Sequence, residues 1–89
     1  MATIVTRHKV GDAKAWIAGH QDRLDLFAPA ITGYKAFQDM DDPNSVVLVI
    51  EVTDLELLGS IINDPKIQGI KDKHTVLEPI TMSTEIFYE

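Results

Sequence analysis

The stretch VVLVIEVTDLELL at residues 46–58 joins the most apolar strand of the chain directly to a helix. Residues 46–50 are all apolar, so the strand predicted over 46–53 has apolar side chains on both faces. Asp54 is a typical N-cap residue, and the helix that follows it is predicted to run to Asn63. Its inner face is marked by a helical spacing of apolar residues, Leu55, Leu58 and Ile62.

The remaining elements extend outward from this β–α unit. A β-branched, alternating run predicts a first strand over residues 3–9, and a helical pattern over 13–27 follows the N-cap Asp12. Further strands are predicted over 31–38 and 81–88.

A short helix is predicted to restart at Asp64-Pro65, with Ile67, Ile70 and His74 on its inner face. The order βαββαβ is that of the α+β ferredoxin-like fold, a four-stranded antiparallel sheet with two helices on one face. We expect residues 1–89 to form a single domain.

Composition excludes several classes of function. Eight Lys and Arg against 14 Asp and Glu give a net charge of −6, which argues against nucleic-acid binding. The absence of cysteine removes disulfides, thiol catalysis and thiolate metal sites. No signal peptide or membrane span is recognised, so we expect a cytoplasmic protein that does not contact membranes. No metal or cofactor motif is present, and the acidic turn 39–44 lacks the glycine of a calcium loop.

The sheet face opposite the helices is predicted to be apolar as well. Neither residues 46–50 nor the sequence Ile86-Phe87-Tyr88 alternates with polar residues. An apolar face of this size usually marks an interface, so a homodimer through the open sheet face is expected. The alternative is that β-branched residues on this face remain in water.

The chain resembles the dimeric α+β barrel proteins. The resemblance is carried by the element order, a tryptophan in the first helix, residues 46–58, the DDPNSVV turn (41–47) and NDP (63–65). It implies a barrel formed by two sheets, with a ligand pocket between sheet and helices in each subunit. Members include cofactor-free monooxygenases of antibiotic biosynthesis and polyketide cyclases. Asn63 and Trp16 supply the residue types of the monooxygenase Asn/Trp pair, without a matching motif.

His20 is the first candidate for chemistry. It lies four residues after Trp16, within the predicted inward arc of the helix, where an imidazole beside an aromatic wall could move a proton. The alternative is a core histidine that hydrogen-bonds one strand residue.

Three more residues are candidates for substrate binding. Tyr34 could donate to a ligand oxygen or be an ordinary half-buried strand tyrosine. His74 could face the pocket or cap the short helix, where the dipole favours a histidine. Arg7 and His8 point to opposite sides of the first strand. Whichever faces the helices could reach a ligand, and the other would lie in the dimer barrel; Arg7 could instead form a salt bridge.

The sequence therefore predicts a small homodimer that binds a small aromatic or polyketide-like molecule. If it is an enzyme, we expect cofactor-independent monooxygenation or cyclisation, with His20 as base and Trp16 and Tyr34 as positioning groups. The alternatives are a ligand-binding regulatory module and a purely structural barrel. Fold alone does not decide among them.

Overall fold

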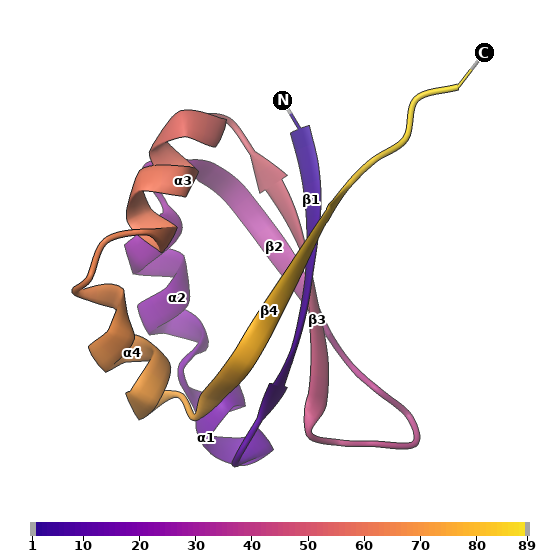
Figure 1. Cartoon of the computed structure of the whole chain (residues 1–89), viewed down its shortest axis with the longest axis vertical. Helices are drawn as coiled ribbons and strands as arrows, with labels where there is room; N and C mark the ends of the chain where they lie inside the picture. The colour runs from indigo at the N-terminus through magenta and orange to yellow at the C-terminus, as the bar shows by residue number, and fades with distance from the viewer. Residues whose placement is uncertain (1, 89) are drawn as a thin grey trace.

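The computed structural model describes residues 2–88 and has the predicted α+β ferredoxin-like arrangement (Figure 1). Its four antiparallel strands lie in the order β2-β3-β1-β4. The elements in chain order are β1 (Ala2–Val10), α1 (Ala13–Ala18), α2 (His20–Phe27), β2 (Ile31–Gln38), β3 (Ser45–Val52), α3 (Leu55–Ile62), α4 (Ile67–Lys73) and β4 (Val76–Thr84).

All helices cover one face of the sheet and leave the other open (Figure 1). Strand β3 divides its apolar run between these faces. Val46 and three further alternate residues are buried under the helices, whereas Val47 and Val49 on the open face are half-buried. The core joins these β3 residues to Ile4 of β1 and Leu58 of α3. The central strand is therefore apolar on both faces, as predicted.

The helix predicted over residues 13–27 is two short helices. Asp12 caps the first one as expected, because its carboxylate accepts from the backbone N–H groups of Lys14 and Ala15. The helix breaks at Gly19, and α2 starts at the next residue. At this break a Cβ on Gly19 would lie 2.5 Å from Nε2 of His74. Close packing of a buried imidazole on the backbone thus accounts for the glycine.

The second half of the chain follows the sequence prediction with two differences. Asp54 caps α3 through Leu57 N–H (3.0 Å), but α4 starts at Ile67 instead of Pro65. The last strand occupies Val76–Thr84, not the predicted 81–88.

Pro79 precedes the predicted strand but lies inside β4 in the structure. Strand β4 is at the edge of the sheet, where a residue without an N–H is tolerated. Opposite His8, between Arg7 and Lys9, the β1–β4 register shifts, so the irregularity falls next to the cavity described below. Among residues 2–88 there is no helix with the length and apolar character of a membrane span.

Candidate functional site

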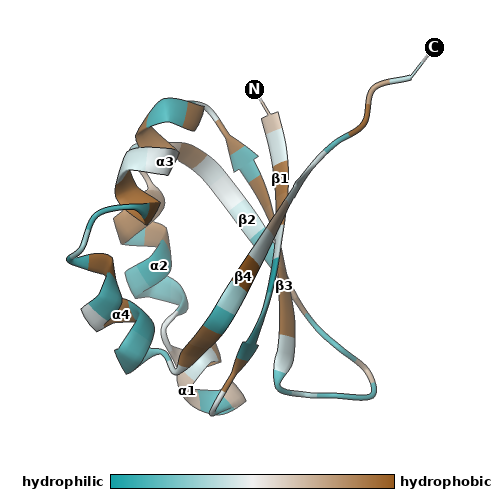
Figure 2. Cartoon of the chain, viewed as in Figure 1, coloured by the Kyte–Doolittle hydropathy of each residue, from teal (hydrophilic) through white to brown (hydrophobic). Residues whose placement is uncertain are grey.

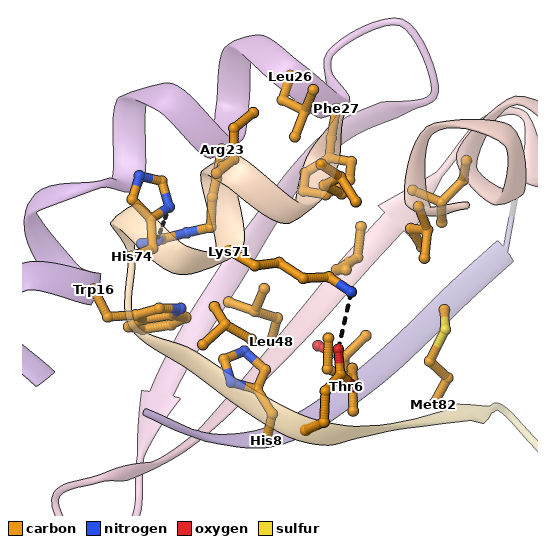
Figure 3. Close-up of a pocket in the computed structure, with 18 of the residues that line it drawn as sticks. Thr6, His8, Trp16, Arg23, Leu26, Phe27, Leu48, Lys71, His74 and Met82 are labelled. Carbon is orange, nitrogen blue, oxygen red and sulfur yellow. Dashed lines mark hydrogen bonds and ion pairs between the residues drawn. The ribbon is translucent and has the colours of Figure 1, made fainter. Parts of the chain in front are cut away.

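A cavity of about 270 Å³ lies between the sheet and the helices (Figure 3). Most of its wall is apolar, and both the sheet and the helices contribute to it. The apolar lining residues are Trp16, Leu26, Phe27, Leu48, Ile50, Leu58, Ile62, Ile67, Ile70, Val76, Ile80 and Met82. The polar lining residues are Thr6, His8, Arg23, Asn63, Lys71, His74 and Glu78. An apolar space with a few convergent polar groups is the usual form of a small-molecule site.

His8 is placed in the cavity by the alternation of β1. Thr6 and His8 are buried on the helix side, whereas Arg7 is exposed on the open face. The Nδ1 atom of His8 lies 3.0 Å from the carbonyl oxygen of Lys9. A carbonyl only accepts, so Nδ1 carries the proton and Nε2 is left as an acceptor. Burial lowers the pKa of His8 from its ordinary 6.5, which favours this neutral form.

Arg23 covers the indole of Trp16. Its guanidinium carbon lies 4.1 Å from the centre of the indole ring, a cation–π geometry, and both residues are buried. Arg23 Nε also donates to the hydroxyl of Tyr34 (3.3 Å), and Nη1 donates to Nδ1 of His74 (3.3 Å). A buried cation is therefore held in one position by an aromatic ring and two hydrogen-bond acceptors.

His74 caps the C-terminus of α4 and lines the cavity, so both predicted placements apply. Because a guanidinium only donates, Nδ1 of His74 accepts from Arg23, and its Nε2–H faces the carboxylate of Asp22 (3.4 Å). Hydrogen bonds from Lys73 and His74 lower the pKa of Asp22 below its ordinary value. Both nitrogens of His74 are thus engaged within the protein, which suits a supporting role.

The prediction that His20 faces inward is wrong. His20 is exposed, does not line the cavity, and its Nδ1 lies 2.6 Å from the hydroxyl of Tyr34. Tyr34 is half-buried and also lies outside the lining, although its hydroxyl bonds Arg23. His20 therefore joins the outer end of a hydrogen-bonded chain whose inner end is the cavity wall. A catalytic role for His20 remains a prediction that this position does not support.

Of the other predicted residues, Trp16 and His74 lie in the cavity wall and Arg7 does not (Figure 3). Arg23 is not among the residues predicted from the sequence, although the sequence contains a signal for it. Arg23 follows Trp16 by seven residues and precedes Phe27 by four, so the three share one helical face.

An ion pair between α4 and β4 also lines the cavity. Lys71 Nζ lies 3.0 Å from Oε1 of Glu78, and Figure 3 shows the extended side chain of Lys71 with this contact as a dashed line. Within residues 2–88 no three His, Asp or Glu side chains are grouped so that they could hold a metal ion. The site as built presents one buried guanidinium, one imidazole acceptor and one indole donor to an apolar space.

Fold and cavity together define a small ferredoxin-like α+β protein with an internal site. No protein-family model and no curated protein matches the sequence. Solved structures do match. The cofactor-independent oxygenase SnoaB from Streptomyces nogalater is 17% identical, with 98% of this chain and 94% of that chain covered and a TM-score of 0.72.

Two further structures are described as candidate antibiotic biosynthesis monooxygenases. The protein from Bordetella bronchiseptica is 16% identical, with 99% and 97% of the two chains covered and a TM-score of 0.75. That from Nitrosomonas europaea is 12% identical, with 94% and 86% covered and a TM-score of 0.68. The chain thus has the fold of monooxygenase-like small proteins, and the predicted resemblance is confirmed at the level of fold.

Proposed function

We propose that the protein binds a small aromatic or polyketide-like molecule in the cavity and oxidises it as a cofactor-independent monooxygenase. The observation that carries the proposal is the cavity, whose apolar wall is interrupted by Arg23, His8 and the indole of Trp16. The wall suits a flat apolar ring system, and the polar groups suit oxygen substituents on it. The likeness to a cofactor-independent oxygenase supports the reaction class.

The simplest reaction that needs no added reductant converts an activated methylene between aromatic rings into a ketone. Dioxygen supplies one oxygen atom to the carbonyl and the other to water, so the substrate provides all four electrons. Loss of a proton from the substrate starts the reaction, and the nearby positive charge of Arg23 stabilises the resulting anion. Cyclisation of a polyketide-like chain needs the same anion but no dioxygen.

The proposal is tested by incubating the protein under ¹⁸O₂ with polycyclic phenols that carry a methylene between two aromatic rings, and in parallel with an open-chain polyketone, and analysing the products by mass spectrometry. Monooxygenation predicts one labelled oxygen atom in the product. A cyclase gives a dehydrated product without label, and a binding module retains the ligand unchanged. His20→Ala is the informative variant, because an exposed residue outside the cavity should leave turnover intact. Loss of turnover in that variant would restore His20 as the base.

A homodimer through the open sheet face belongs to the same proposal. Val47 and Val49 are half-buried there, and Phe37 beside them is 54% exposed. The chain end beyond β4 extends away from the subunit with Ile86 and Phe87 in solvent (Figure 1). Covering this surface would stabilise a domain that buries little on its own. Hydropathy along the strands is shown in Figure 2.

Sedimentation at micromolar concentration tests the dimer. Val49→Lys places a charge in the middle of the open face and should give a monomer with the same fold by circular dichroism. Lys14→Glu is a control on an exposed helix position and should remain dimeric. A wild-type monomer would contradict the proposed interface. We also propose that the protein is cytoplasmic, which cell fractionation tests separately.

A further inference from the structure

Two polar atoms in the cavity wall have no partner among residues 2–88. Trp16 is 2% exposed, and its Nε1–H is buried without a hydrogen bond. His8 is 7% exposed; its Nδ1 is occupied by the Lys9 carbonyl, and no hydrogen bond in the described chain involves Nε2. A buried donor without an acceptor is rare in folded proteins and calls for an explanation. A ligand oxygen that accepts from the indole supplies one.

The two rings are neighbours. Their centroids are 5.8 Å apart with an interplanar angle of 72°. In Figure 3 both rings lie beside Leu48, and the indole nitrogen is on the side of the ring that faces Leu48 and the cavity. Each hydrogen bond spans about 3 Å between heavy atoms, so one small molecule can contact both rings. The pair therefore offers one donor and one acceptor to a single ligand.

The charges around His8 fix its part in the pair. Arg23 and Lys71 face it from the helices, and Glu78 faces it from β4. Burial keeps the imidazole neutral, so Nε2 presents a lone pair. The two cations against one carboxylate favour a ligand oxygen that carries negative charge density. An acidic hydroxyl fits these conditions, because it donates to Nε2 and develops negative charge as it does so.

We infer that His8 Nε2 and Trp16 Nε1–H form an acceptor–donor pair that selects aromatic ligands carrying both an acidic hydroxyl and a separate carbonyl oxygen. The hydroxyl donates to His8, and the carbonyl oxygen accepts from Trp16. This inference rests on the proposed function in that it uses the same cavity. It goes further in assigning the ligand's two polar groups to two named atoms.

Four probes of one ring system test the pair: tetralin, tetralone, tetrahydronaphthol, and a hydroxytetralone with its hydroxyl meta to the ketone. Their affinities are measured by calorimetry for the wild type, Trp16→Phe and His8→Phe. Trp16→Phe should weaken the two ketones about 3- to 10-fold, and His8→Phe should weaken the two phenols by the same factor. Tetralin should bind all three proteins within twofold, which also shows that each variant retains the cavity.

A second measurement requires no variant. In protein labelled with ¹⁵N-histidine, the Nε2 resonance of His8 should shift when tetrahydronaphthol binds and stay in place when tetralone binds. Tetralin binding without discrimination among the four probes, or an unmoved Nε2 resonance, would overturn the inference and leave the cavity as a ligand site. Failure of all four to bind would overturn the proposed function together with the inference.

Discussion

Gly19→Ala is the substitution that tests the packing around the site most directly. A Cβ at this position would lie 2.5 Å from Nε2, 2.6 Å from Cε1 and 2.7 Å from Cδ2 of His74. Ordinary carbon contacts are about 3.5–4.0 Å, so the ring has to move by roughly 1 Å. His74 is 3% exposed and held between Arg23 and Asp22, which leaves it little room.

The net effect follows from three terms. Overpacking costs about 1–3 kcal/mol, and a weakened Arg23–His74 hydrogen bond costs about 1 kcal/mol more. Alanine in place of glycine returns about 0.5–1 kcal/mol, because the Gly19 φ of −83° is accessible to any residue. We therefore expect the free energy of unfolding to fall by about 1–3 kcal/mol.

Urea unfolding monitored by the single tryptophan and by circular dichroism measures this change. The protomer concentration is held fixed, because any dimerisation contributes to the measured stability. Gly59→Ala is the matched control. It lies within α3 with nothing within 4 Å of its Cβ, so it should stabilise by about 0.5–1 kcal/mol. Equal shifts for both variants would refute the packing of His74 on Gly19.

Three further predictions concern single residues. Because burial lowers the pKa of His8 in the folded state, the unfolded chain takes up its proton first as the pH falls below about 6.5. Wild-type stability should therefore decrease between pH 7.5 and 5.5, and His8→Phe should flatten that part of a urea-unfolding profile. Arg23→Ala removes a buried side chain that stacks on an aromatic ring and donates to two acceptors, so it should lower the free energy of urea unfolding by about 2–4 kcal/mol. Lys14→Ala, at an exposed position, is the control and should change it by less than about 0.5 kcal/mol. Thr75 has a φ of 60°, and its hydroxyl accepts from Asp12 N–H at 3.0 Å. In thermal unfolding, Thr75→Val should therefore lose about 1–2 kcal/mol of stability. Thr75→Asn, which tolerates this backbone and retains an acceptor, should stay within about 1 kcal/mol of the wild type.

Turn and cap chemistry made the fold predictable. Asp12 and Asp54 start helices through their own carboxylates, and the apolar run 46–50 marks the central strand whatever surrounds it. These signals are local, so one sequence is enough to interpret them. The last strand was misplaced because an edge strand tolerates Pro79, a property of position in the sheet that local sequence does not encode.

The site was only partly predictable because the inward face of the first helix was centred on the wrong residues. In a regular helix over residues 13–27, the apolar Ile17 lies on the same face as Trp16, but in the structure Ile17 is 53% exposed. A face that includes both Ile17 and Trp16 also includes His20, whereas the buried Arg23 lies at its edge. A buried arginine is stable only when its partners are in place, and His74, 51 residues away, becomes a partner through the tertiary fold alone.

Helix α4 lines the cavity without contributing to the buried core. It supplies Ile67, Ile70 and Lys71 to the cavity wall, yet none of its residues is buried. The buried hydrophobic core lies instead on the sheet, with Trp16 of α1, Ala30 and Leu58 of α3. Substitutions in α4 can therefore reshape the cavity at small cost to folding. A lineage with this architecture can change the shape of its cavity by altering a single turn of helix while the rest of its sequence stays under the same constraints.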